Sequence, residues 1–133
     1  MQYVDSSALV KRYIREPDSE QGHRLLAADP DWLTAAVTEV EVRRVLAIRL
    51  HSVALNEARS DFLRDWERMS VVALDATTLG QAADLAERTR LRSLDAIHLA
   101  AFMRAGSRST RLLTFDVRLA AAARSLGWAV VGA

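Results

Sequence analysis

Apolar residues along this chain occur in short unbroken runs and in longer segments where they recur every three or four positions. The short runs predict strands and the longer segments predict amphipathic helices. The predicted strands cover residues 2–4, 32–35, 70–74, 112–115 and 128–131. None of them alternates apolar with polar residues, which is typical of parallel strands buried on both faces. The pattern predicts an α/β fold with a central parallel sheet of about five short strands and helices on both faces.

Seven helices are predicted around these strands, and several have end signals. They cover about residues 7–14, 17–29, 37–50, 55–69, 76–90, 94–105 and 116–126. Residues favoured at helix starts are Ser6 or Ser7, Asp18, Asp75 and Ser93, and residues favoured after helix ends are Gly106 and Gly127.

Length and composition say little about the fold, but they exclude some kinds of chemistry. A chain of 133 residues is expected to form a single domain over residues 1–133. It has no cysteine, which excludes disulfides and thiolate metal sites. The first residues show no secretion-signal pattern and no apolar run has membrane-spanning length, so we expect a cytoplasmic location and no membrane partner. The net charge of +1 does not by itself indicate a nucleic-acid partner.

Two aspartates stand directly after predicted strands. Asp5 follows the first strand and Asp116 follows the strand that ends at Phe115. In parallel α/β sheets, functional groups gather beyond the carboxyl ends of the strands. Each aspartate could instead cap the next helix, which needs no catalysis.

Asp95 lies in a helix that is apolar on nearly every side, Leu94-Asp-Ala-Ile-His-Leu-Ala-Ala-Phe-Met103. A carboxylate there is costly unless it is paired, protonated or bound to a metal. Because Ser93 would start this helix, Asp95 could also be a first-turn residue stabilised by the helix dipole. We favour a metal ligand, and we interpret His98, one turn later, as a packing residue.

Glu39 and Glu41 are about 200° apart on one predicted helix, so only one can face inward. Glu41 shares a stripe with Val37, Val45 and Ile48, whereas Glu39 has the i, i+4 spacing of an exposed ion pair with Arg43. Glu41 is therefore the predicted inward acid.

Four acids from four segments predict one metal site. Clustered carboxylates repel one another, and a divalent cation is the usual reason that a fold tolerates them. Oxygen ligands favour Mg²⁺ or Mn²⁺, which can activate a water for phosphodiester hydrolysis. Basic residues near these acids could bind substrate phosphates, although solvated helix faces are an alternative explanation; the candidates are Lys11, Arg12, Arg43, Arg92 and Arg118.

Four motifs resemble the PIN-domain nucleases, and among them the VapC-type toxins. Tyr3-Val-Asp-Ser-Ser-Ala-Leu-Val10 is similar to the opening strand and its Asp-x-Ser/Thr motif, and Thr34-Ala-Ala-Val-Thr-Glu-Val-Glu41 is similar to the segment that supplies a glutamate. Leu94-Asp-Ala-Ile-His-Leu-Ala100 and Leu112-Leu-Thr-Phe-Asp116 resemble the third and fourth motifs.

The resemblance implies a PIN-like three-layer fold and a metal-dependent endoribonuclease that is the toxin of a toxin–antitoxin pair. It implies Mg²⁺ or Mn²⁺ as cofactor, an RNA substrate, a homodimer and a small antitoxin, with a larger toxin–antitoxin assembly as a further expectation. The catalytic and metal-binding residues that it implies are Asp5, Glu41, Asp95 and Asp116, with Ser7 and Thr114 as auxiliary hydroxyls.

Two other functions stay open at the level of sequence. A phosphoaspartyl phosphatase or receiver-like domain also places an aspartate at a strand end, but it needs a second acid two residues after Asp5, where Ser7 stands, or a late lysine, and Lys11 is the only lysine. A non-catalytic PIN-like interaction module would use the four acids only as caps. The sequence does not identify the RNA.

An apolar stripe in the predicted helix 55–69 suggests a groove for an antitoxin peptide, with Phe62, Leu63 and Trp66 as candidate anchors. The alternative is ordinary core packing, because amphipathic helices usually owe their stripe to their own core.

Overall fold

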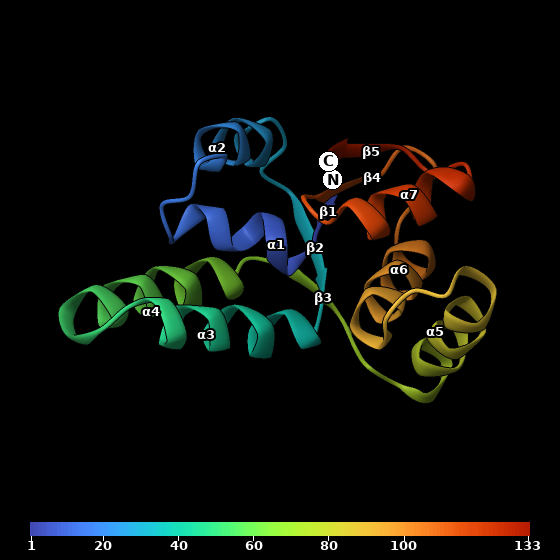
Figure 1. Ribbon diagram of the computed structural model, residues 1–133, viewed down its shortest axis with the longest axis horizontal. Helices are drawn as coiled ribbons and strands as arrows, with labels where there is room; N and C mark the ends of the chain where they lie inside the picture. The colour runs from blue at the N-terminus through green and yellow to red at the C-terminus, as the bar shows by residue number, and fades with distance from the viewer.

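The computed structural model describes all 133 residues and contains one parallel sheet with the strand order β3-β2-β1-β4-β5 (Figure 1). The strands are β1 (Gln2–Val4), β2 (Trp32–Ala35), β3 (Ser70–Val72), β4 (Arg111–Thr114) and β5 (Val130–Gly132). Every neighbouring pair is parallel. The predicted parallel sheet of five short strands is therefore confirmed.

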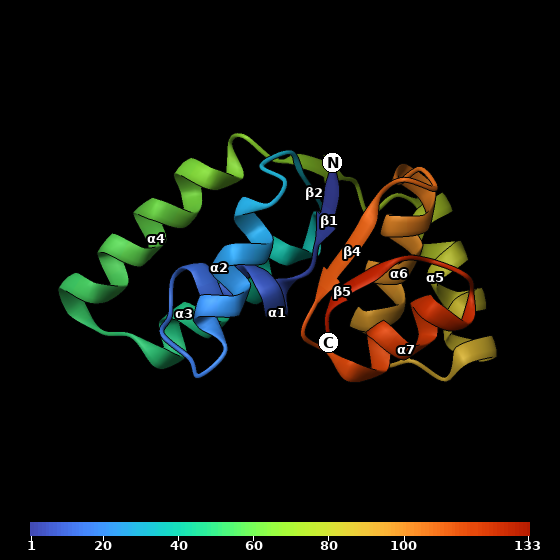
Figure 2. The same cartoon turned by 90° about the horizontal axis from the view of Figure 1, so that it is seen from above.

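Helices cover both faces of this sheet, as Figures 1 and 2 show. The helices are α1 (Ser6–Leu9) with the 3-10 turn η1 (Val10–Arg12), α2 (Ser19–Ala27), α3 (Val37–Arg49), α4 (Ser52–Trp66), α5 (Ala76–Thr89), α6 (Ser93–Ala105) and α7 (Val117–Ser125). Helices α1 to α4 lie on one side and α5 to α7 on the other, which makes the predicted three layers. No helix is both long enough and apolar enough to cross a membrane.

The two central strands divide their side chains between two hydrophobic cores. Tyr3 and Leu112 belong to the core under α5 to α7, whereas Val4 and Leu113 belong to the core under α1 to α4. Successive residues of a strand point to opposite faces. Both faces therefore require apolar residues, which explains why the strand sequences show no alternation.

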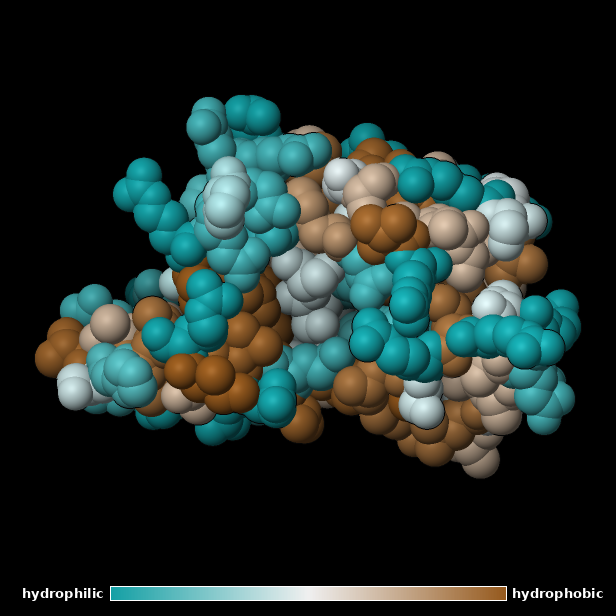
Figure 3. Space-filling view, in the orientation of Figure 1, coloured by the Kyte–Doolittle hydropathy of each residue, from teal (hydrophilic) through white to brown (hydrophobic).

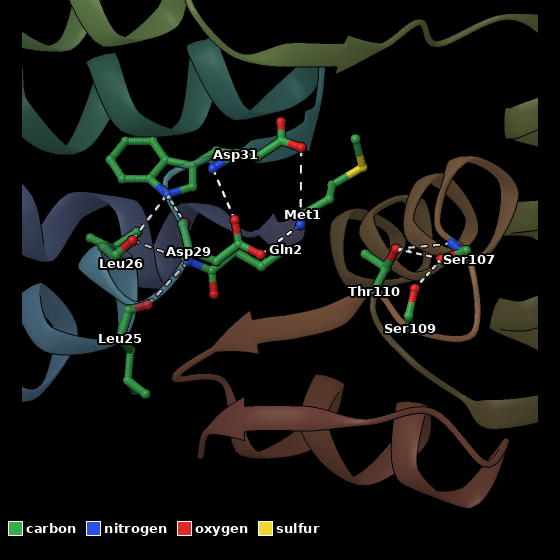
Figure 4. A network of polar contacts seen from close by, with 10 residues as sticks. Met1, Gln2, Leu25, Leu26, Asp29, Asp31, Ser107, Ser109 and Thr110 are labelled. Carbon is green, nitrogen blue, oxygen red and sulfur yellow. Dashed lines mark hydrogen bonds and ion pairs between the residues drawn. The ribbon is translucent and has the colours of Figure 1, made fainter.

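The end of the sheet where β1 and β2 begin is tied to the last turn of α2 (Figure 4). The Gln2 side-chain amide donates to the carbonyls of Leu25, Leu26 and Asp29, at 2.8 to 3.2 Å. The Trp32 indole N–H also donates to Leu26 and Asp29. These bonds satisfy carbonyls that a helix end leaves without partners.

Several predicted boundaries differ from the structure. The first helix becomes a 3-10 turn after Leu9 and does not continue to residue 14. Asp5 caps it by accepting from the Ala8 N–H at 3.1 Å, so the predicted Ser6 or Ser7 cap is wrong. Ser93 is likewise the first residue of α6 and not its cap. The Asp75 cap of α5 is confirmed, since its carboxylate accepts from the Thr78 N–H.

Differences also occur at three other elements. Helix α4 covers residues 52–66 and not 55–69, and β3 ends at residue 72. The last strand runs over residues 130–132, two positions later than its predicted start. Gly127 has a φ of +81°, and the Trp128 ring packs on Phe102 with centroids 4.8 Å apart. Trp128 therefore completes the turn before the strand.

Phe62 belongs to the hydrophobic core and not to an exposed groove. Its side chain is 0% exposed, and it packs against Tyr13 and Trp66 with ring centroids 5.7 and 5.6 Å apart. Trp66 and Leu63 are partly buried against the same core. The antitoxin anchor predicted at Phe62 is therefore wrong, because the apolar stripe of α4 packs into the hydrophobic core on its own side of the sheet.

We expect Phe62→Ala to lower the free energy of unfolding by about 3–5 kcal/mol, because it leaves a cavity in the core. Chemical denaturation of the purified protein measures this loss. Val53→Ala is the matched control on α4, where Val53 is 67% exposed, and it should change stability by less than about 0.5 kcal/mol. Similar losses in the two variants would contradict the burial of Phe62.

Candidate active site

The four predicted acids all lie at the carboxyl edge of the sheet. The N-terminal ends of α1, α3, α6 and α7 come together near the middle of the molecule in Figure 1. Figure 3 shows a recessed strip of intermediate hydropathy in this region, bordered by hydrophilic residues, between the two groups of helices. Because parallel strands end at one edge, residues from distant parts of the sequence meet there.

Asp5 is buried at the end of β1 and is held by three hydrogen bonds. Its Oδ1 accepts from the Ser7 hydroxyl at 2.7 Å and from the Ala8 N–H at 3.1 Å, and its Oδ2 accepts from the Thr114 hydroxyl at 2.8 Å. Burial raises the pKa of Asp5 and outweighs the charge of His98 and these hydrogen bonds, which lower it. The folded chain therefore holds this carboxylate in one orientation at an electrostatic cost.

Ser7 and Thr114 connect the ends of β1 and β4. The Ser7 hydroxyl oxygen accepts from the Phe115 N–H at 2.9 Å, and the Thr114 hydroxyl oxygen accepts from the Asp116 N–H at 3.0 Å. Both hydroxyls also donate to Asp5. The two residues predicted as auxiliary hydroxyls thus fix the position of Asp5 relative to the start of α7.

Asp95 and Asp116 lie on either side of one guanidinium. Asp116 caps α7, accepting from the N–H groups of Arg118 and Leu119 through Oδ1. Its Oδ2 is 3.7 Å from Arg92 Nη2, and Asp95 Oδ2 is 3.5 Å from Arg92 Nε. Asp95 Oδ2 is buried and accepts no hydrogen bond. Burial and the charge of Asp116 raise the pKa of Asp95, and Arg92 opposes them.

Asp95 is nevertheless a first-turn residue of α6, as its alternative explanation required. Asp95 is therefore both a first-turn residue that the helix dipole stabilises and a neighbour of the other acids. The dipole stabilises a negative charge in the first turn, but it supplies no hydrogen bond to Oδ2.

Glu41 faces the cluster, although the predicted face of α3 is only partly right. The buried residues of α3 are Thr38, Val42 and Leu46, and Ile48 is 58% exposed. Ile48 therefore does not belong to the core-facing stripe. Glu41 lies beside Val42 at the edge of that stripe, and its Oε1 is 2.6 Å from His98 Nε2.

Glu39 points away from the cluster, as predicted. Its Oε1 accepts from Arg43 Nη1 at 3.1 Å, across one helical turn. Arg43 is thereby engaged in this exposed pair, so its predicted contact with substrate has no support in the geometry.

His98 has a larger role than the packing assigned from the sequence. The ring is buried, with Nδ1 2.8 Å from the Tyr3 hydroxyl and Nε2 2.6 Å from Glu41. Burial lowers the pKa of His98, but the hydrogen bond with Glu41 and the charges of Asp5, Glu41 and Asp95 outweigh it, so the pKa is raised. The only sequence signal was a histidine one turn after Asp95.

These interactions connect the four acids into one cluster. The negative charges of Asp5, Glu41 and Asp95 all raise the pKa of His98, and the charge of Asp116 raises the pKa of Asp95. The four acids that the sequence singled out are therefore linked electrostatically, through His98 and Asp95, at one edge of the sheet.

The residues at this edge fit a hard divalent ion in chemistry, but no closed cage is present. No three carboxylate or imidazole groups lie close enough together to hold one ion between them. Mg²⁺ usually keeps several waters and takes only one or two carboxylates directly. Asp95, whose buried Oδ2 accepts no hydrogen bond, and Asp116, on the other side of the Arg92 guanidinium, supply such a pair. A metal site formed by all four acids stays a prediction.

Two of the predicted phosphate-binding residues lie elsewhere and are already paired. Lys11 is buried, with Nζ at 2.7 Å from Glu16 and 2.6 Å from Asp18. Its stem also packs against Gly22, where an added Cβ would approach within 3.0 Å. Arg12 pairs with Asp65 at 2.6 Å. The predicted substrate role is therefore wrong for Lys11, because a buried, doubly paired ammonium is not accessible to phosphate.

Arg92 and Arg118 remain candidates by position. The Arg92 side chain is 70% exposed while it contacts both Asp95 and Asp116. Arg118 is exposed in the first turn of α7. Both can reach solvent at the edge of the cluster, as a phosphate contact requires.

Comparison with known proteins gives the same assignment. The PIN domain family matches residues 2–125. Ribonuclease VapC46 of Mycobacterium tuberculosis is 37% identical over 129 residues, covering 97% of this chain and 95% of the relative. The crystal structure of Mycobacterium tuberculosis VapC20, described as a toxin that cleaves the sarcin–ricin loop, has a TM-score of 0.75 at 21% identity and covers 92% of this chain and 95% of that chain. A toxin–antitoxin complex from Klebsiella pneumoniae has a TM-score of 0.66 at 16% identity over 87% of each chain.

The two solved structures show that the fold is shared. The family match and the VapC46 relative go further, because both extend over nearly the whole sequence. The matched residues include Asp5, Glu41, Asp95 and Asp116. PIN-domain VapC ribonucleases generally use a divalent metal, and the carboxylate oxygens at this edge have the chemistry that such an ion prefers. This chain belongs to the PIN-domain family, alongside the VapC ribonucleases.

Proposed function

We propose that this chain is a Mg²⁺- or Mn²⁺-dependent endoribonuclease and the toxin of a toxin–antitoxin pair. The observation that carries the proposal is the cluster of four acids around His98 and Arg92, in which the buried Asp95 Oδ2 has no hydrogen-bond donor. The name of the VapC46 relative supports RNA as substrate.

The acids would hold the ion directly or through its waters, with Asp95 and Asp116 as the direct pair. When bound, the ion supplies a water of lowered pKa and positive charge for the phosphate oxygens. Ser7 and Thr114 hold the Asp5 carboxylate in one orientation at the end of β1. Arg92, which is 70% exposed between Asp95 and Asp116, would be available to contact a phosphate oxygen.

The two other functions have less support. A phosphoaspartyl enzyme needs an aspartate oxygen that is free to attack, whereas both oxygens of the buried Asp5 accept hydrogen bonds. A non-catalytic module would need the acids only as caps. Asp5 and Asp116 do cap helices, but Glu41 and Asp95 accept no capping hydrogen bond, so capping does not account for all four acids.

Cleavage of defined RNA tests the proposal. The purified chain should cut single-stranded RNA in Mg²⁺ or Mn²⁺, should stop when EDTA is added, and should resume with excess metal. Sequencing of the new RNA ends after induced expression then identifies the substrate. Cleavage that continues unchanged in EDTA would rule out the metal-dependent mechanism.

A small antitoxin and a second copy of the chain are the partners that we propose. The toxin–antitoxin complex with a similar fold supports the first. Co-expression with the neighbouring small reading frame, followed by light scattering, measures both assemblies. A monomer that no co-expressed protein inhibits would contradict the toxin assignment, although not the nuclease activity.

We expect Arg92→Gln to raise the KM for RNA several-fold with little change in kcat, because it removes one phosphate contact. The dependence of log affinity on log salt should become shallower by about 0.7, the value for one contact to a single strand. Arg43→Gln, which removes a guanidinium already paired with Glu39, is the control and should leave the slope unchanged. If the slope of log affinity against log salt is the same in the wild type and in Arg92→Gln, Arg92 does not contact an RNA phosphate.

A further inference from the structure

Tyr3, His98 and Glu41 form a hydrogen-bonded chain that runs from the hydrophobic core to the acidic cluster. Tyr3 and His98 are buried, and their rings meet edge to face with centroids 6.0 Å apart. The Tyr3 hydroxyl is 2.8 Å from Nδ1, and Nε2 is 2.6 Å from Glu41 Oε1. The three residues come from β1, α6 and α3. This series of hydrogen bonds therefore connects both sides of the site.

The direction of the last hydrogen bond follows from the groups themselves. An ionised carboxylate can only accept. Nε2 must therefore carry a proton toward Glu41, whether the ring is neutral or charged. In the neutral ring Nδ1 is then the acceptor, and the Tyr3 hydroxyl is the donor that satisfies it.

We propose that His98 is a positioning residue that holds Glu41 toward the acidic cluster, and that the Tyr3 hydroxyl holds the His98 ring in the orientation this requires. The inference rests on the proposed function, since it assigns a task within the same site. Glu41 lies at the edge of α3 with a flexible side chain, and no other side chain donates a hydrogen bond to it. His98 and Tyr3 themselves are immobilised by the core around them.

A role in packing alone accounts less well for these residues. An imidazole in an apolar core needs two partners to offset its desolvation, and an aliphatic residue would fill the same space without them. Here one of those partners is a carboxylate of the site, which a satisfied core histidine does not need. Residues that orient metal-binding groups typically affect metal affinity or activity about 10–100-fold when replaced.

Two amide variants separate positioning from packing. His98→Gln keeps an amide N–H close to the place of Nε2, whereas His98→Asn keeps one close to Nδ1 and loses the donor to Glu41. We expect His98→Asn to lower kcat about 10–100-fold with little change in the KM for RNA, and His98→Gln to remain within a few-fold of wild type. Mn²⁺ affinity, measured by calorimetry without RNA, should follow the same order.

Tyr3→Phe removes only the hydroxyl and should weaken Mn²⁺ binding less than His98→Asn does. Equal effects of His98→Asn and His98→Gln on both Mn²⁺ affinity and kcat would overturn the positioning role, because only His98→Gln keeps a donor near the place of Nε2.

Nitrogen-15 NMR of the imidazoles gives a readout that does not depend on activity or on metal. The chain has three histidines, and the signal lost in His98→Gln identifies His98. A proton on Nε2 supports the inference, and an unprotonated Nε2 refutes it. If the wild-type chain cleaves no RNA, the proposed function fails, but the NMR and Mn²⁺ measurements still decide whether His98 positions Glu41.

Discussion

Asp5→Asn and Asp95→Asn are each expected to abolish metal-dependent RNA cleavage while leaving the metal-free fold at least as stable as the wild type. Each change removes one charge from a cluster whose members repel one another. Asparagine can keep the hydrogen bonds that Asp5 accepts at Oδ1 from Ser7 and Ala8, and the Thr114 hydroxyl can turn to accept from the new amide. Activity and melting temperature should therefore change in opposite directions.

The stability gain should depend on pH. Burial raises the pKa of both Asp5 and Asp95 above 3.8. A carboxyl group whose pKa is raised binds its proton more tightly in the folded state, so its ionisation at higher pH destabilises the fold. The gain over wild type should be largest near neutral pH and should disappear as the pH falls toward 3.8, the ordinary value.

Urea denaturation in EDTA, at several pH values, measures this difference. Asp84→Asn on α5 is the matched control, because Asp84 is exposed and outside the cluster. It should change neither the activity nor the pH dependence of stability. If Asp5→Asn or Asp95→Asn cleaves RNA at the wild-type rate in Mg²⁺, that residue is not part of the metal site.

Glu41→Gln is expected to lower kcat on the order of 100-fold, a typical loss when one electrostatic group of an active site is removed. Glu39→Gln, two residues earlier on the same helix, should leave kcat unchanged. Glu41 contacts His98 at the cluster, whereas Glu39 pairs with Arg43 on the exposed side of α3. An exposed pair one turn apart contributes only about 0.3–0.5 kcal/mol to stability.

The amide oxygen that Glu41→Gln introduces can still accept from His98, so a fold defect should not explain the loss. Circular dichroism and the melting temperature check this for both variants. Steady-state cleavage of one RNA at saturating Mg²⁺ then compares them. Equal losses, or a larger loss in Glu39→Gln, would overturn the orientation of α3.

Local sequence determined much of the fold and the positions of the acids. The apolar runs identified all five strands. For β1 and β4 the reason is burial on both faces, whereas the edge strand β3 is largely exposed. Asp5 and Asp116 could be placed at the active edge because the carboxyl ends of parallel strands always meet there. Helical periodicity separated Glu41 from Glu39 for a similarly local reason, because the angle between two residues of a helix does not depend on its surroundings.

Only the tertiary structure decided which of these side chains are buried and which residues they contact. Helical angle alone did not show that Ile48 is exposed, because the core-facing stripe depends on the elements that cover it. Phe62 and Lys11 looked accessible in the sequence, yet both are buried once α1, α2 and α4 pack together. His98 meets Glu41 across 57 positions of sequence, and Tyr3 across 95. Such a hydrogen-bonded chain has no local pattern, because it exists only where three elements are brought together by the sheet.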